Sequence, residues 1–280
     1  MFPDAGITKG DLIDYYLKVA DMMMPHIKNR ALTLHRFPDG IGADGFYQQN
    51  ASDYFPDWIP RATLGKGKDK TEHAVCNDTA TLVYLANQAV ITPHVWLSRT
   101  DQPDHPDRMI FDLDPADDDF DTVRSAARAL HEALDTLDLA CFLMTTGSRG
   151  LHVVVPLDRG SDFDAVRDFA RRLADRVTER APDEFTTEQR KNKRAGRLFL
   201  DTTRNAYGQT AVAPYAVRAK PGAPVAAPLE WKELNDAKLT SRRYHLGNIA
   251  RGLRQREDPW RSIGRHAVKL EAHRKRLEKL

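Results

Sequence analysis

The segment from Arg108 to Leu157 constrains the fold most, because it places a tight hairpin directly after a strand and a helix. Residues 108–113 form a short apolar run, and apolar residues at helical spacing follow over 120–137. Two further apolar runs, 141–144 and 151–157, are separated by a polar turn at 145–150 that contains glycine. Hairpins mixed with helices predict an α+β fold rather than a regular parallel βαβ array.

The same signals predict further elements on both sides of this segment. They are a helix at 11–28, a strand at 32–37, a mostly buried helix at 79–89, a strand beginning at 94, a helix at 163–177, a strand at 198–200 and a basic amphipathic helix from 266 onward. Residues 65–70 and 220–228 are candidate flexible segments, because they are rich in Gly, Pro and Lys.

Composition excludes some classes of protein and favours a polyanionic partner. The chain is 41% hydrophobic and 29% charged, an ordinary globular balance, and no apolar stretch approaches the roughly 20 residues that would span a bilayer. The N-terminus carries no secretion signal, and the two cysteines offer no disulfide framework, so we expect a cytoplasmic protein. The net charge is only +2, but residues 241–280 hold twelve Lys/Arg against four Asp/Glu. Such segregation suggests nucleic acid, although a charge run also fits a solvated face.

The run Ile110-Phe111-Asp112-Leu113-Asp114 is the sharpest chemical signal. In a strand, residues i and i+2 point to the same face, with their Cα atoms about 6.7 Å apart. Two carboxylates on one face repel each other unless a cation lies between them. The pair is therefore a candidate for binding divalent metal, while the alternative is that both simply face solvent at a strand end.

A second apolar strand ends in a carboxylate at Leu198-Phe199-Leu200-Asp201. If this strand pairs beside the first, at a spacing of about 4.8 Å, the three aspartates converge. Three carboxylates suit hard ions such as magnesium or manganese, and two-metal sites place their ions about 3.5–4 Å apart. The alternative is that Asp201 only opens the turn that follows it.

Residues near these acids could bind phosphate. Glycines in the 145–150 turn allow close backbone approach, and Ser148 and Arg149 could cradle an anion, although an ordinary hairpin turn is the simpler interpretation. Cations at 191–194 and at Arg218 flank Asp201 in the sequence and suit a triphosphate. Phe46 and Tyr47 lie in a loop-like stretch and could stack on a base, but taken alone they fit a buried core pair slightly better.

Taken together, the motifs resemble the polymerase domain of bacterial DNA ligase D, in the archaeo-eukaryotic primase superfamily. The resemblance runs from Ile7 to Tyr244, and the sequence begins inside what resembles the family's opening motif. The resemblance implies one catalytic domain over 1–280, with template and 5′-phosphate contacts in 1–107 and the metal and nucleotide site in 108–280. Its expected fold is a central mixed or antiparallel sheet flanked by helices. The motifs that carry it are 111–115, 147–152, 194–201 and 213–215.

The resemblance also implies a role for each matching residue. Two metal ions, Mn²⁺ or Mg²⁺, are expected on Asp112, Asp114 and Asp201. The residues expected to hold the incoming triphosphate are Ser148, Arg149, His152, Arg194 and Arg218. Those expected near its sugar, for which the family favours the ribose form, are His94 and Thr146. Lys9 is expected to contact a 5′ phosphate, and Phe46 with Tyr47 to pack on the template.

The implied activity is gap filling and end extension in non-homologous end joining, with gapped duplex DNA and NTP or dNTP as substrates. The expected partners are Ku and a DNA ligase domain, fused or separate, with no membrane and with association with the nucleoid. Two alternatives stay open at this point. One is a phosphohydrolase of the haloacid dehalogenase type with Asp112 as nucleophile, and the other is an inactive scaffold that binds DNA ends.

Overall fold

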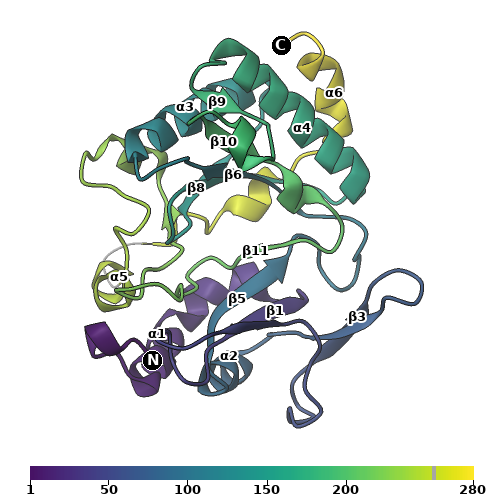
Figure 1. Cartoon of the computed structure of the whole chain (residues 1–280). Helices are drawn as coiled ribbons and strands as arrows, with labels where there is room; N and C mark the ends of the chain where they lie inside the picture. The colour runs from purple at the N-terminus through teal and green to yellow at the C-terminus, as the bar shows by residue number, and fades with distance from the viewer. Residues whose placement is uncertain (254–256) are drawn as a thin grey trace. The chain divides into compact units, whose positions relative to one another are not determined.

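The computed structural model describes residues 1–253 and 257–280 (Figure 1). The chain divides into two compact units, each assembled from three segments. Unit 1 consists of residues 1–103, 210–227 and 242–258, and unit 2 consists of residues 104–209, 228–241 and 259–280. Among the helices in the described ranges, none is long and apolar enough to cross a membrane.

Unit 2 is built on a six-stranded sheet in the order β12-β7-β8-β6-β10-β9, in which all pairs except β9–β10 are antiparallel. Helices α3 and α4 pack against this sheet (Figure 1). Its strands are β6 (Arg108–Asp114), β7 (Phe142–Thr145), β8 (Leu151–Pro156), β9 (Phe185–Thr186), β10 (Leu198–Asp201) and β12 (Pro228–Leu229). Its helices are α3 (Phe120–Thr136), α4 (Phe163–Arg180) and α6 (Glu271–Leu277).

The two long helices of unit 2 begin where the sequence supplies a cap. Asp119 accepts a hydrogen bond from the amide of Asp121, and Asp162 accepts one from the amide of Ala165. An aspartate at this position satisfies an amide that the helix itself cannot. The apolar face predicted for the second helix is buried, with Phe163, Val166, Phe169, Leu173 and Val177 at most 3% exposed.

Unit 1 holds a four-stranded antiparallel sheet in the order β11-β5-β1-β2 and a separate hairpin, β3–β4. Its strands are β1 (Leu32–Arg36), β2 (Phe46–Gln48), β3 (Arg61–Leu64), β4 (Thr71–Ala74), β5 (Val90–Trp96) and β11 (Thr210–Val212). Its helices are α1 (Lys9–Ile27), α2 (Thr79–Asn87) and α5 (Leu246–Leu253). The first two pack against each other.

Several predicted elements need correction. The strand expected to begin at residue 94 begins at Val90, and the basic C-terminal helix is confined to Glu271–Leu277. Residues 65–70 are the turn of the β3–β4 hairpin. The 220–228 segment is not a free linker, because residues 223–227 are buried and Val225 bridges to Val217. Proline and glycine in this segment mark tight turns within a packed region.

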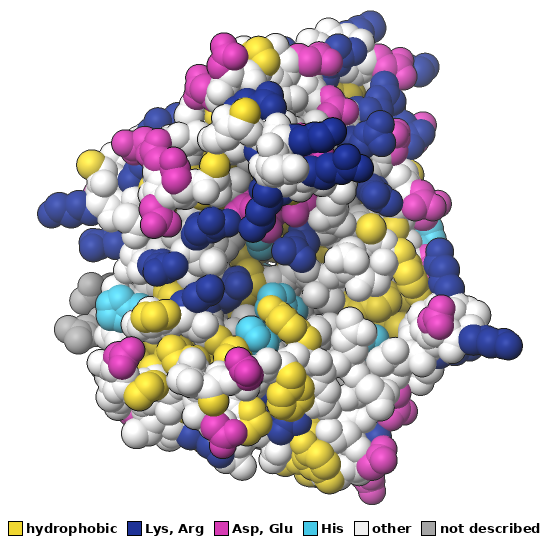
Figure 2. Space-filling model, viewed as in Figure 1, with side chains coloured by type: hydrophobic (Ala, Val, Ile, Leu, Met, Phe, Trp, Pro, Cys, Tyr) yellow, Lys and Arg dark blue, Asp and Glu magenta, His cyan; other side chains and the backbone are white. Residues whose placement is uncertain are grey.

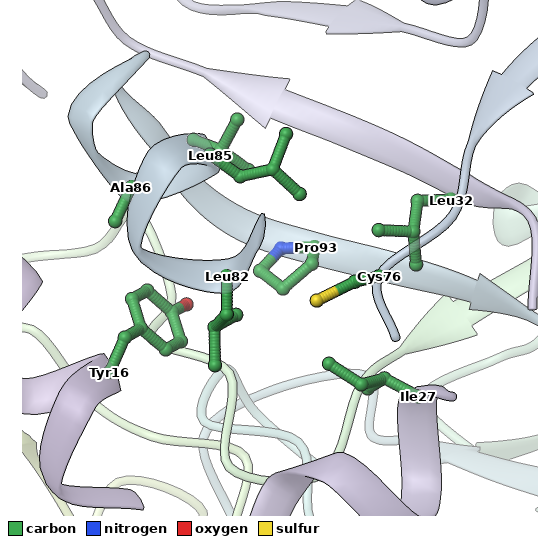
Figure 3. Close-up of a pocket in the computed structure, with 9 residues that line it drawn as sticks. Tyr16, Ile27, Leu32, Cys76, Leu82, Leu85, Ala86 and Pro93 are labelled. Carbon is green, nitrogen blue, oxygen red and sulfur yellow. The ribbon is translucent and has the colours of Figure 1, made fainter. Parts of the chain in front are cut away.

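A small apolar cavity of about 10 Å³ lies in unit 1 between the first two helices and β5 (Figure 3). Leu82, Leu85 and Ile27 project into it beside the sulfur of Cys76. A volume of this size holds about one water molecule, so the cavity is a packing defect and not a ligand site.

We expect both thiols to be inert in the folded protein. Burial, reinforced by the nearby Asp78, raises the pKa of Cys76 to about 12, and burial with Asp135 does the same for Cys141. Only the thiolate attacks a disulfide, so an aromatic disulfide reagent at pH 8 should react at least about 100-fold more slowly than with free cysteine. Cys141→Ser isolates the Cys76 signal, and both thiols should react at once in urea. Fast, complete labelling of the native chain would contradict the assigned burial.

Candidate functional site

Three carboxylates meet on one face of the unit 2 sheet. Asp112 and Asp114 alternate along β6 with Phe111 and Leu113, which are fully buried and so project to the opposite face. β10 pairs antiparallel with β6 and places Asp201 directly opposite Asp112. The three aspartates therefore converge, as the two apolar strands that end in carboxylates predicted.

Cationic side chains surround these carboxylates. Arg149 lies 2.9 Å and Arg194 3.3 Å from opposite oxygens of Asp114. Asp112 lies 3.6 Å from Arg204 and 3.5 Å from Nε2 of His152. His152 is the register partner of Asp112 on β8 and is almost fully buried, and its Nδ1 has no hydrogen-bond partner among the described residues. A buried ring nitrogen without a partner is available to a bound ligand.

Arg194 is held rigidly in this site. Its guanidinium donates to the carbonyl oxygens of Glu188 and Gln189 and stacks over the ring of Phe199 at 4.0 Å. Phe199 is in turn the register partner of Asp114, so one cross-strand pair fixes both the arginine and its carboxylate. A planar, preorganised guanidinium is well suited to phosphate oxygens, because it can donate two parallel hydrogen bonds.

The turn after β7 is shaped by Thr146. Its hydroxyl donates to the carbonyl of Gly150 and accepts from the amides of Ser148 and Gly150. Gly147 has φ of +64°, a conformation that favours glycine. Thr146 thus organises the backbone that presents Ser148 and Arg149, while its expected contact with a nucleotide sugar stays a prediction.

Two site residues were not predicted from the sequence. Asn205 is fully buried, and its side-chain amide accepts from the backbone N–H and donates to the carbonyl of Ile110. It therefore fastens the turn after Asp201 to the strand that carries Asp112. Arg204, on the same turn, reaches Asp112. The turn chemistry of residues 201–205 was visible in the sequence, but its attachment to β6 depends on long-range pairing.

The donor set suits a hard divalent cation. Residues directly opposite each other in an antiparallel pair have Cβ atoms about 4.5–5.5 Å apart, and like charges there destabilise the sheet unless a cation intervenes. Carboxylate oxygens are the ligands that magnesium and manganese prefer. Within residues 1–253 and 257–280, no three His, Cys, Asp or Glu side chains already form a metal-binding group. Asp114 is paired with two arginines instead, so binding a metal requires Asp114 to exchange those partners.

Unit 1 carries the remaining predicted residues. Tyr47 is 60% and Phe46 47% exposed, and both lie on the edge strand β2. The loop assignment and the buried-core interpretation of this pair were therefore wrong, because a short edge strand leaves both side chains uncovered. His94 lies on β5, and Lys9 is an exposed residue in the first turn of α1. Arg218 is part-exposed and follows Val217.

The space-filling view shows the surface character of each unit (Figure 2). On the viewed face of unit 2, Lys and Arg side chains gather. On the viewed face of unit 1, hydrophobic side chains lie beside histidines. Clustered Lys and Arg side chains are typical of surfaces that bind the phosphate backbone of nucleic acid.

His35 should make the stability of the protein depend on acid. Burial, together with the charges of Arg218 and Lys220, lowers its pKa from 6.5 to about 4. The unfolded state then binds more protons than the folded state between these two values, so the free energy of unfolding should fall as the pH drops from 6.5 towards 4. Urea unfolding at pH 7 and pH 5 should show a smaller loss for His35→Phe than for the parent chain. The exposed His266→Phe is the control, and an unchanged slope in His35→Phe would contradict the assignment.

Comparison with known protein families shows to which family the chain that carries this site belongs. The family described as LigD, primase-polymerase domain, matches residues 8–260. The chain belongs to this family. The resemblance drawn from the four motifs is therefore confirmed, and the haloacid dehalogenase alternative is wrong.

Individual relatives agree with the family match. The multifunctional non-homologous end joining DNA repair protein LigD of Mycobacterium tuberculosis H37Rv is 33% identical over 262 residues, which is 90% of this chain and 34% of the relative. The bifunctional non-homologous end joining protein LigD of Bacillus subtilis is 34% identical over 232 residues, 82% of this chain and 37% of the relative. The chain thus spans about a third of the curated relatives it matches.

A solved structure confirms the fold. The polymerase domain of Mycobacterium tuberculosis ligase D, determined in complex with DNA, superimposes with a TM-score of 0.89 at 30% identity. The match covers 95% of this chain and 96% of that structure. The predicted α+β class, with sheets flanked by helices, is confirmed.

Proposed function

We propose that this chain catalyses template-directed nucleotidyl transfer, filling gaps and extending DNA ends during non-homologous end joining. The observation that carries this proposal is the row Asp201–Asp112–His152 on three adjacent strands, with Asp114 and its two arginines beside it. The names of the LigD relatives and the DNA bound to the similar polymerase domain support it.

The proposed reaction is in-line attack of a primer 3′-hydroxyl on the α-phosphorus of a nucleoside triphosphate, with pyrophosphate leaving. Two divalent ions, Mn²⁺ or Mg²⁺, held by Asp112, Asp114 and Asp201, would supply Lewis acidity at the attacking and leaving oxygens. Arg149 and Arg194 would hold the β and γ phosphates, whose negative charge grows as the bond breaks.

The remaining residues would position the substrates. The buried Nδ1 of His152 would donate to a phosphate oxygen, and Ser148 would present its backbone and hydroxyl from the turn after β7. In unit 1, Arg218 would contribute a further cation for the triphosphate, and His94 would lie near the sugar, with ribonucleotides preferred. Phe46 and Tyr47 would pack on the template, and Lys9 would contact the 5′ phosphate across the gap.

The proposed cellular setting follows from the LigD relatives, which are named for end joining. The chain would act in the cytoplasm on DNA ends at the nucleoid, together with Ku and a DNA ligase domain that seals the nick. A ligase domain in the same or another polypeptide would fit the fact that this chain matches about a third of those proteins.

Extension of a labelled primer on a gapped duplex tests the proposal. The 280-residue chain is incubated with Mn²⁺ or Mg²⁺ and with ATP or dATP opposite a templating thymine, and pyrophosphate release is measured in parallel. Stoichiometric extension and pyrophosphate release support nucleotidyl transfer, and the ratio of the ATP and dATP rates gives the sugar preference. Tight DNA binding without extension would contradict the proposal and favour the inactive scaffold.

A further inference from the structure

The exposed ring of Tyr47 is backed by a histidine on the neighbouring strand. β1 and β2 pair antiparallel with His35 directly opposite Tyr47. The two rings stack with centroids 4.0 Å apart and an angle of 7° between their planes. One face of Tyr47 is therefore covered, while the residue as a whole remains 60% exposed. The exposed part of the ring is available to a planar ligand.

His35 is itself fixed by what packs behind it. Phe37 meets the His35 ring edge-on at 4.5 Å and is 8% exposed. Phe37 fits closely against Gly45, where an added Cβ would lie 2.4 Å from the phenylalanine ring. The rings of His94 and Tyr47 form a T-shaped pair with centroids 5.7 Å apart. Phe37, His35 and Tyr47 thus form a continuous row of rings that runs from the packed interior of unit 1 to its surface.

We propose that His35 is a positioning residue that fixes the ring plane of Tyr47, so that a template nucleobase can stack on the exposed face. This inference rests on the proposed function, in which Tyr47 packs on the template. A tyrosine on an edge strand would otherwise lose side-chain freedom when a base binds, and that loss weakens binding. Stacking on His35 removes this freedom before the base arrives.

The uncharged state of His35 supports this role. Because burial and the nearby Arg218 and Lys220 lower its pKa to about 4, the ring is neutral at physiological pH. Two neutral aromatic rings at this distance attract each other through dispersion and packing. A neutral His35 also carries no charge through which a DNA phosphate could attract it away from Tyr47. The contact should therefore persist when DNA binds.

Fluorescence of 2-aminopurine at the templating position of a gapped duplex tests the proposal, because stacking quenches this base and no catalysis is needed. Tyr47→Ala should reduce the quenching and weaken binding about 10-fold, within the range for the loss of one base–aromatic stack. His35→Ala should reduce the quenching and weaken binding about 3-fold, because the tyrosine remains but is no longer held. His35→Phe should restore both, and His35→Ala should have no further effect in a Tyr47→Ala background.

Several outcomes would overturn the proposal. They are additive effects of His35→Ala and Tyr47→Ala, failure of His35→Phe to restore quenching, and an equal loss in Trp58→Ala, which removes a 51% exposed aromatic residue outside the row. A quenching signal that Tyr47→Ala leaves unchanged would also overturn it. Unfolding curves of each variant show whether a loss of binding comes from destabilisation of the fold. Absence of primer extension, with the quenching pattern intact, would contradict the proposed catalysis alone.

Discussion

Asp112→Asn should reduce primer extension at least about 100-fold while leaving the fold intact, because the change removes one of three charges that the proposed metals require. The substitution keeps the shape of the side chain at the point where β10, β6 and β8 lie in register. It also removes the repulsion between Asp112 and Asp201 across the strand pair. The free energy of unfolding should therefore change by no more than about 1 kcal/mol.

The measurement is single-turnover extension at saturating Mn²⁺, together with DNA binding and urea unfolding. Asp183→Asn is the matched control, because Asp183 is an exposed acid of the same unit outside the site, and it should extend primers at the parental rate. A rate of extension by Asp112→Asn within about threefold of the parental rate would show that Asp112 is not needed for catalysis. The loss of a charge-stabilising group normally lowers the rate far more than that.

Gly150→Ala should disrupt unit 2, with an expected loss of about 3 kcal/mol or more in the free energy of unfolding. A Cβ at this position would lie 1.7 Å from the carbonyl oxygen of Leu113, far inside any allowed contact. The obstacle is strand backbone and not a flexible side chain, so β6 and the turn after β7 must separate. Because Leu113 lies between Asp112 and Asp114, this movement should also displace the carboxylates and abolish extension.

Gly264→Ala provides the control, because Gly264 belongs to the same unit and an added Cβ there meets nothing within 4 Å. Urea unfolding should give nearly parental stability for this variant and a lower midpoint for Gly150→Ala. A Gly150→Ala protein with parental stability would show that the turn and β6 are not packed as described. The glycine is thus explained by backbone approach within the sheet, and not only by the phosphate cradle suggested from the sequence.

Local pattern was sufficient to predict much of unit 2. The apolar runs that end in Asp114 and Asp201 became neighbouring strands of one sheet, and the 145–150 turn joined the hairpin β7–β8. These features depend on side-chain alternation and turn chemistry, both of which a few consecutive residues determine. Their convergence followed once the two strands were assumed to pair.

Features that depend on pairing between distant segments could not be predicted. No local signal shows that Arg149 and Arg194 engage Asp114, or that Asn205 binds the backbone of Ile110. The exposure of Phe46 and Tyr47 depends on β2 being an edge strand, which is a property of the whole sheet. For the same reason the stack on His35 becomes visible only when the register of β1 and β2 is known.

The arginines beside the aspartates have a consequence for the order of binding. Asp114 is paired with Arg149 and Arg194, and Asp112 with Arg204, so cationic side chains offset much of the carboxylate charge without any ligand. Under the proposed function, cations that take the carboxylates would leave the arginines unpaired, and a triphosphate that takes the arginines would leave the carboxylates unpaired. Either ligand alone therefore breaks the ion pairs of Asp114 and leaves one side without a partner, whereas both together give Asp114, Arg149 and Arg194 new partners. Metal and nucleotide should consequently bind with positive cooperativity, each raising the affinity for the other by the same factor.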